Sequence, residues 1–162
     1  MSRRHRFAWP VLLMLVAMAA ACSDRGETPS GSGASGAVPG PPLPAACQLV
    51  TAPDVQSAIG APVSEDAASR PDRCRYVSDR SENVEITVDR PGFSSAVRSY
   101  RGLYPEAQAV EGIGDEAAVR VDNRTGELIA VKGTARLFVV VTGGSPNRDA
   151  LLAIGRIAAR RL

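Results

Sequence analysis

Histidine and tryptophan are absent from all but the first residues of this sequence. The only histidine is His5 and the only tryptophan is Trp9. Histidine is the most common general base and a principal ligand of zinc and copper. If the first 21 residues are removed as a targeting segment, the remaining chain has no Ser-His-Asp or Cys-His catalytic site and no histidine-containing metal site.

An excess of charge of either sign is also lacking. The sequence has 19 Lys and Arg residues against 17 Asp and Glu residues. Three of the basic residues, Arg3, Arg4 and Arg6, lie in the first 21 residues, so the rest has 16 basic and 17 acidic residues and a net charge of −1. No basic footprint for nucleic acid remains, and we expect no nucleic-acid partner.

Long apolar runs are confined to the N-terminus, where the sequence predicts a cleaved signal. Three arginines precede the apolar segment 7–20, which is too short for a stable bilayer span, and small residues then lead to Cys22. Residues 1–21 resemble a bacterial lipoprotein signal, which implies that Cys22 is lipidated and holds the protein on the outer side of the cell membrane. The alternative is an ordinary secretion signal with an incidental cysteine.

Residues 22–45 have almost no large apolar side chain and are rich in Gly, Ser, Pro and Ala. Such a composition cannot bury enough surface to offset the entropy cost of ordering, so it predicts a disordered tether that follows Cys22. A tether of this length has a typical reach of roughly 25–30 Å. A binding motif for a proline-recognition module is the alternative.

Residues 46–162 predict one globular domain. Thr51, Asp54 and Pro53 mark the start of a short helix that Gly60 ends. The pattern then predicts further elements, in this order: strands 74–78 and 83–89, a helix opened by Pro91 and ended by Pro105, strands 117–121, 127–132 and 136–142, and a final helix capped by Ser145 or Asn147.

The order α-β-β-α-β-β-β-α predicts the α+β class, with helices packed on a mainly antiparallel sheet of about five strands. In strand 83–89, Val84, Ile86 and Val88 alternate with polar residues, which indicates one buried and one wet face. Residues 137–141 are apolar on both faces, so we expect that strand to be central and covered on both sides. Helices should cover one face and part of the other.

Only three cysteines are present, and an odd number in an exported protein needs an explanation. If Cys22 is acylated, Cys47 and Cys74 remain as a pair, and export favours a disulfide between them. The alternative is a redox-active pair, which usually has a Cys-x-x-Cys spacing that is absent here.

Two further groups are candidates for a site. Asp115 and Glu116 follow Gly112-Ile113-Gly114 and form a possible acidic turn, although a plain glycine turn with polar residues before a strand is the simpler explanation. Gly112 and Gly114 do not make a dinucleotide fingerprint, because the third glycine is missing. The tyrosines at 76, 100 and 104 are candidates either for a ligand pocket or for the core.

The pattern from Cys47 to Val63, then Cys74-Arg75-Tyr76 and the turn 112–117, resembles small secreted lipoproteins of actinobacteria in uncharacterised families. The resemblance covers most of residues 46–162. It implies a disulfide-stapled α+β domain displayed at the cell envelope and carries no catalytic residue with it. Similar extracellular domains occur as sensor modules, which implies binding by analogy.

These observations predict a non-enzymatic, membrane-anchored binding module without cofactor or metal, whose partner is an envelope protein, an envelope polymer or a small ligand. One alternative is a glycan-acting enzyme with two catalytic carboxylates, such as Asp115 paired with Glu85 or Glu116. Another is a carrier that holds an apolar ligand in a cavity between sheet and helices.

Overall fold

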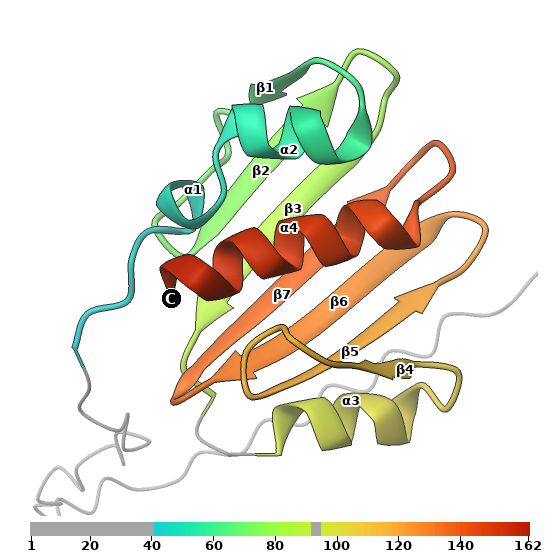
Figure 1. The fold of residues 1–162 in the computed structure, drawn as a ribbon. Helices are drawn as coiled ribbons and strands as arrows, with labels where there is room; N and C mark the ends of the chain where they lie inside the picture. The colour runs from blue at the N-terminus through green and yellow to red at the C-terminus, as the bar shows by residue number, and fades with distance from the viewer. Residues whose placement is uncertain (1–40, 92–94) are drawn as a thin grey trace, which may run out of the picture. The chain divides into compact units, whose positions relative to one another are not determined.

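The computed structural model describes residues 41–91 and 95–162, which belong to the compact unit Gly33–Leu162 (Figure 1). The predicted signal peptide, Cys22 and most of the predicted tether lie outside the described residues. Within the described ranges the elements are α1 (Ala46–Leu49), α2 (Ala52–Ile59), β1 (Val63–Glu65), β2 (Arg73–Ser78), β3 (Asn83–Asp89), α3 (Ala96–Leu103), β4 (Gln108–Val110), β5 (Glu116–Val121), β6 (Thr125–Lys132), β7 (Ala135–Thr142) and α4 (Arg148–Arg161).

The strands form one sheet in the order β1-β2-β3-β7-β6-β5-β4, and every neighbouring pair is antiparallel. The predicted α+β class and antiparallel sheet are therefore confirmed. β7 is the middle strand, as the apolar residues on both of its faces predicted.

The predicted number and order of elements are wrong in detail. The sheet has seven strands, and the described ranges contain a short first helix that the sequence pattern did not reveal. The missed elements α1, β1 and β4 are only three or four residues long. Segments this short show no periodicity, and β1 and β4 exist only through their pairing with β2 and β5 at the two edges of the sheet.

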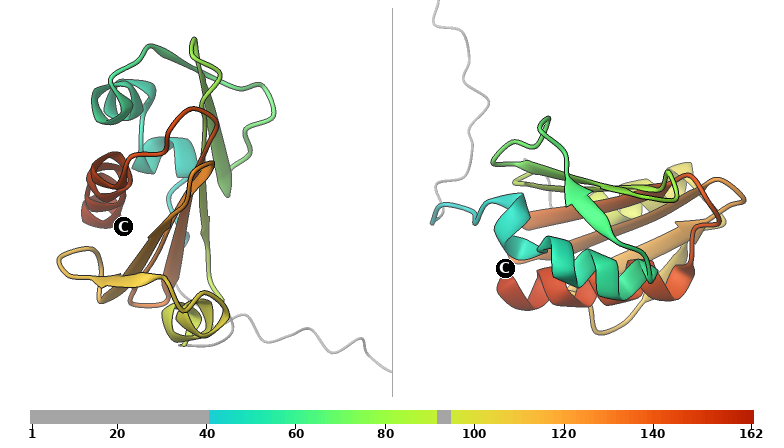
Figure 2. Two further views of the ribbon diagram at one scale, coloured as in Figure 1. Left: turned by 90° about the vertical axis from the view of Figure 1, so that its right-hand side faces the viewer. Right: turned by 90° about the horizontal axis from the view of Figure 1, so that it is seen from above.

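Helices pack on both faces of the sheet, which gives the protein two hydrophobic clusters. α1, α2 and α4 cover the first face, as Figure 2 shows, and α3 packs against β5 and β6 on the second face. Alternate residues of one strand serve the two clusters: Leu128 and Ala130 of β6 face the first, and Ile129 faces the second.

The predicted helix signals are mostly confirmed. Thr51 precedes α2, and Gly60 ends it in the left-handed conformation with φ of 70°. Asn147 caps α4, because its side chain accepts a hydrogen bond from the Asp149 N–H at 2.8 Å. The helix predicted from Pro91 begins later, at Ala96. The described part of the chain contains no helix of the length and apolarity that a bilayer span requires.

Candidate functional site

A groove runs beside α3 on the second face of the sheet, with a volume of about 690 Å³. Its floor contains Ile129 and Phe138, and its helical wall contains Tyr100, Leu103 and Tyr104. We call this hollow the α3 groove. It exists because α3 has only eight residues and packs against β5 and β6, so it leaves the outer faces of β2 and β3 uncovered.

Paired charges line the side of the α3 groove opposite the helix. Arg73 Nε lies 3.5 Å from Glu85 Oε1, and Arg136 Nε donates to Asp89 Oδ1 at 2.9 Å, with a second contact between Arg136 Nη2 and Asp89 Oδ2. All four side chains are partly exposed. The groove therefore presents an apolar floor beside a polar rim whose charges already balance one another.

A cluster around Arg120 holds α3 in place. The Tyr100 hydroxyl donates to Glu127 Oε2 at 2.5 Å, Arg120 Nη2 lies 3.0 Å from the same oxygen, and the Arg120 guanidinium lies over the Tyr104 ring at 4.2 Å. Burial, and then the hydrogen bond to Glu127, raise the pKa of Tyr100 well above its ordinary value, so its proton stays in place near neutral pH. The helical wall of the α3 groove is therefore formed before any ligand arrives.

Leu103 stands out at the edge of the α3 groove. Its exposed fraction is 75%, and among the described residues only Val121, at 38%, is another exposed large hydrophobic residue. Phe138 in the floor is half-buried, and its ring makes an edge-on contact with Tyr100 at 6.1 Å between centroids. An exposed leucine beside a half-buried phenylalanine is an apolar contact surface without a cover in the described domain.

The predicted tyrosines separate into two places. The rings of Tyr100 and Tyr104 are in tilted contact at 4.9 Å between centroids and line the α3 groove, so they serve both the second cluster and the pocket. Tyr76 lies in the first cluster with 1% exposure, and its hydroxyl donates to the Val50 carbonyl at 2.7 Å. Tyr76 is thus a core residue away from the groove.

The acidic turn does not meet Glu85. The Gly133 N–H donates to Asp115 Oδ2 at 2.6 Å, and the Asp115 N–H donates to the Val131 carbonyl at 2.7 Å, so this residue ties two loops together. Glu116 lines a hollow on the other side of α3. Asp115, Glu116 and Glu85 therefore line three different hollows.

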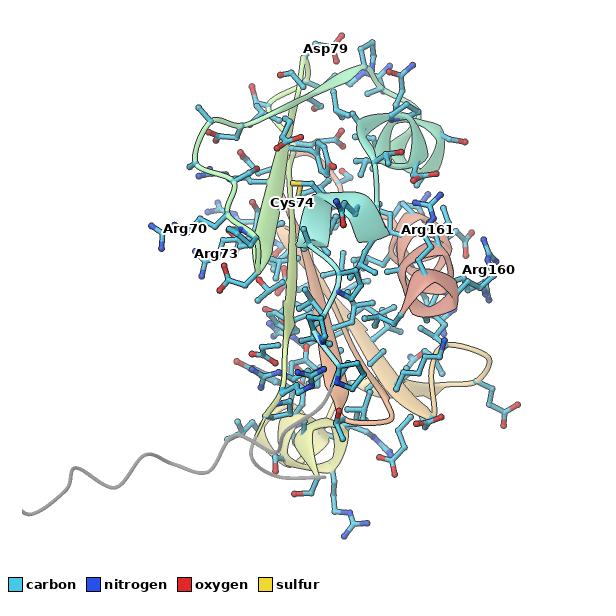
Figure 3. The ribbon with its side chains drawn as sticks, turned by 90° about the vertical axis from the view of Figure 1, so that its left-hand side faces the viewer. Arg70, Arg73, Cys74, Asp79, Arg160 and Arg161 are labelled. Carbon is cyan, nitrogen blue, oxygen red and sulfur yellow. A yellow bond between two sulfur atoms is a disulfide. The ribbon has the colours of Figure 1, made fainter. Side chains whose placement is uncertain are left out.

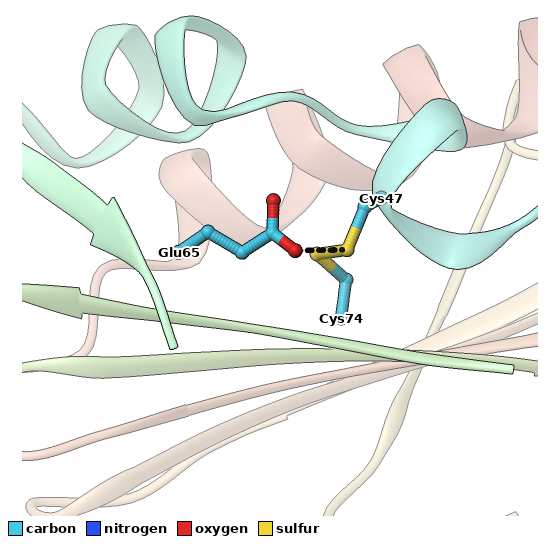
Figure 4. A group of neighbouring side chains, drawn as sticks. All are labelled: Cys47, Glu65 and Cys74. Carbon is cyan, nitrogen blue, oxygen red and sulfur yellow. Dashed lines mark hydrogen bonds between the residues drawn. A yellow bond between two sulfur atoms is a disulfide. The ribbon is translucent and has the colours of Figure 1, made fainter. Parts of the chain in front are cut away.

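The predicted disulfide between Cys47 and Cys74 is present, with 5.0 Å between the Cα atoms (Figure 4). It joins α1 to β2 and buries Cys74 in the first cluster. Glu65 Oε1 lies 3.3 Å from Cys47 Sγ, so the three side chains have the spacing of a metal site. Sulfur atoms bonded to each other offer no thiolate and no hydrogen, so the oxidised pair is a structural crosslink.

The sequence pattern showed some groove residues but not the groove. Glu85, Thr87 and Asp89 were visible as the wet face of β3, whereas nothing local places Arg73, Glu127 and Arg136 beside them. The strand order brings these residues together.

Among known proteins, no family, no curated protein and no solved structure matches this chain.

Proposed function

We propose that this protein is an envelope lipoprotein, anchored through Cys22, whose domain is a non-enzymatic binding module. Its ligand in this proposal is an extended segment of a partner envelope protein, bound in the α3 groove. The single observation that carries the proposal is the exposed Leu103 beside the apolar floor of a preformed groove.

The polarity of the groove supports a protein ligand. Specific protein interfaces have an apolar centre surrounded by a polar rim, and here the apolar side chains of Phe138 and Leu103 line the same groove as the charged side chains of Arg73, Glu85 and Asp89. Among the described residues, no buried side-chain nitrogen or oxygen lacks a partner. The groove thus offers shape and apolar contact, and an apolar side chain of the ligand fits between Leu103 and Phe138.

In vivo photocrosslinking tests this proposal. A photoreactive phenylalanine analogue replaces Leu103 in the native envelope, and we expect one dominant crosslinked protein. Val121 is the matched control position, because it is the second exposed large hydrophobic residue of the described ranges and lies on β5, outside the groove lining. Equal capture at both positions, or none at Leu103, contradicts the proposal.

A second variant tests whether the contact between Leu103 and the ligand is apolar. With the photoreactive residue moved to Ser99, which also lines the α3 groove, the additional change Leu103→Asp should abolish capture. The change Val121→Asp is the control and should leave capture unchanged. Unchanged capture in Leu103→Asp would show that Leu103 does not anchor the ligand.

One observation favours a carboxylate-dependent glycan-acting enzyme as the second candidate. Glu85 of β3 and Glu127 of β6 are both cross-strand partners of Val140, so they flank it on one face of the sheet and line the same groove. Two strand spacings separate their Cα atoms by about 10 Å. This is near the separation of the two carboxyl groups in inverting glycosidases.

Hydrolysis of purified cell wall distinguishes the two candidates. We expect no turnover by the wild-type protein, because Glu85 is paired with Arg73 and Glu127 with Arg120 and Tyr100. Turnover that is lost in both Glu85→Gln and Glu127→Gln, but kept in Asp115→Asn, would replace the binding module with the enzyme.

A further inference from the structure

A second hollow, of about 430 Å³, lies against the C-terminal half of α4. Its charged lining residues are Lys132, Arg156, Arg160 and Asp115, and we call it the basic hollow. Figure 3 shows Arg160 and Arg161 on α4, on the opposite side of the sheet from Arg73 of the α3 groove. The two hollows therefore belong to different faces of the domain.

The positive charges of the basic hollow are available to a ligand. Within the described ranges, Lys132, Arg156 and Arg160 form no ion pair. Lys132 Nζ donates to the Ala159 carbonyl at 2.7 Å, which fixes the ammonium group and leaves two N–H groups free. The one acidic lining residue, Asp115, already accepts the Gly133 N–H. The lining thus carries three positive charges and one negative charge.

The basic hollow lies at the end of the domain where the chain enters from the tether. Arg90 donates to the Pro41 carbonyl and, through Nε, to Thr134 Oγ1 at 3.3 Å. Thr134 is two residues from Lys132 in the turn between β6 and β7.

The C-terminal end of α4 contacts the same end of the domain. Arg161, which follows Arg160, donates to the Leu49 carbonyl of α1 at 2.9 Å. Leu43 of the entering segment and Leu162 at the C-terminus both pack on the first cluster. A connected set of contacts therefore links the entry of the chain to the basic hollow.

We propose that the basic hollow docks the domain on the anionic phospholipid headgroups of the membrane that carries the Cys22 anchor. The inference rests on the lipid anchor of the proposed function. Each basic residue near an anionic membrane surface strengthens binding by about fivefold, so three such residues are too weak to hold a free protein.

The tether makes this weak attraction sufficient. Pro41 follows Cys22 by 19 positions, and a tether of that length, as the composition predicts it, has a typical reach of about 25 Å. Headgroups within that reach have a high effective concentration, so docking becomes an intramolecular event. Docking through the α4 side leaves the α3 groove, on the other face of the sheet, open to its ligand.

Vesicles with a chemically attached protein test the docking. Residues 22–162 contain three cysteines, two of which form the disulfide, so the Cys22 thiol can be coupled alone to a maleimide lipid. The vesicles are phosphatidylcholine, with or without phosphatidylglycerol, and carry a headgroup-attached quencher. These residues contain no tryptophan, so Thr134→Trp reports on the basic hollow and Leu103→Trp reports on α3 as the control.

We expect Thr134→Trp to be quenched far more strongly on vesicles with phosphatidylglycerol, and Leu103→Trp to be quenched equally on both. Adding Arg156→Glu and Arg160→Glu should lower the docked-to-free ratio by about 25-fold or more. Adding Arg98→Glu and Arg101→Glu on α3 changes the net charge equally and should have little effect, because these exposed arginines line a different hollow. Salt at about 1 M should abolish the difference between the vesicles.

Equal quenching of Thr134→Trp on both vesicles overturns the proposal, and so does an equal loss in the α3 control, which would show attraction by net charge alone. The chemical coupling makes the result independent of whether Cys22 is acylated in cells. Failure of docking is therefore distinguishable from failure of the lipid anchor.

Discussion

Asp54 links the beginning of the domain to its last helix. Its carboxylate accepts hydrogen bonds from the Thr51 N–H at 2.9 Å and the Thr51 hydroxyl at 2.7 Å, and it forms an ion pair with Arg161 at 2.6 Å. The Arg161 hydrogen bond, helped by Thr51 and partly opposed by burial, lowers the pKa of Asp54 from 3.8 to about 2. One side chain therefore stabilises the start of α2 and the end of α4.

We expect Asp54→Ala to lower the free energy of unfolding by about 1–2 kcal/mol near neutral pH, which is the usual cost of losing a helix cap. Because the pKa of Asp54 is lowered in the folded state, its contribution is complete above pH 3.8 and is lost as the pH falls through about 2. Urea denaturation at pH 7 and at pH 2 measures this difference.

Asp79→Ala is the control for this prediction, because Asp79 is exposed at a turn and forms no ion pair within the described ranges (Figure 3). It should change stability little at either pH. A loss in Asp54→Ala that is as large at pH 2 as at pH 7 would show that the ionised carboxylate is not the cause.

The role of a residue could be predicted where it depends on neighbours in the sequence. It could not be predicted where it depends on a partner that is distant in the sequence. Thr51, Asp54 and Gly60 act within one short helix, so the local pattern revealed them. The partner of Asp54 is Arg161, 107 residues away, and only the packing of α4 against α1 and α2 brings the two together. Within its own helix, Arg161 lies in the last turn, where a basic residue already complements the negative helix end and gives no indication of a distant partner.

At the scale of elements, two helical glycines have opposite surroundings. A methyl group on Gly102 of α3 would meet no atom within 4 Å. A methyl group on Gly155 of α4 would lie 2.9 and 3.0 Å from the two terminal carbons of Leu128, where α4 packs against β6. Gly155 therefore permits close packing of helix on sheet, whereas Gly102 only weakens its helix.

We expect Gly102→Ala to stabilise the protein by about 0.5 kcal/mol, because alanine favours helix and meets no obstacle. Gly155→Val should destabilise it by about 1–3 kcal/mol, because the larger side chain pushes Leu128 and the helix away from the sheet. Thermal and urea denaturation of both variants provide the measurement. The prediction is wrong if Gly155→Val is as stable as the wild type.

Long elements could be predicted from the sequence because their patterns are local. The alternation in β3 and the apolar run in β7 predicted both strands correctly, and β7 was correctly expected at the centre of the sheet. β1 and β4 have three residues each, and each is a strand only because it pairs with one neighbouring strand. No local sequence pattern therefore predicts them.

At the scale of the whole molecule, the two faces of the sheet have different proposed tasks. The α4 side carries the basic hollow, and the α3 side carries the groove with Leu103. Neither hollow could be predicted, because each combines side chains from several elements. The groove needs β2, β3, β6, β7 and α3 together, and the hollow needs α4 beside the end of β6 and the loop between β4 and β5.

The anchor itself gives the whole-molecule prediction. Cys22→Ser should release the protein from the membrane fraction in soluble form, because stable attachment needs at least two acyl chains on the cysteine. Cell fractionation followed by immunoblotting measures the distribution, and Ser23→Ala is the control that should stay with the membrane. Wild-type protein found in the medium with an unmodified N-terminus would exclude the lipoprotein assignment.

The strand order also determines how the chain acquires its fold. β1, β2 and β3 pair with their neighbours in sequence, and so do β4, β5, β6 and β7, so the sheet consists of two meanders of low contact order. Only the pairing of β3 with β7 is distant in sequence, and because closing its long loop costs the most entropy we expect it to join the meanders last. Cys47 and Cys74 lie on either side of β1 and precede the whole second meander in the chain, so in the proposed exported protein they can be oxidised before the second meander is complete.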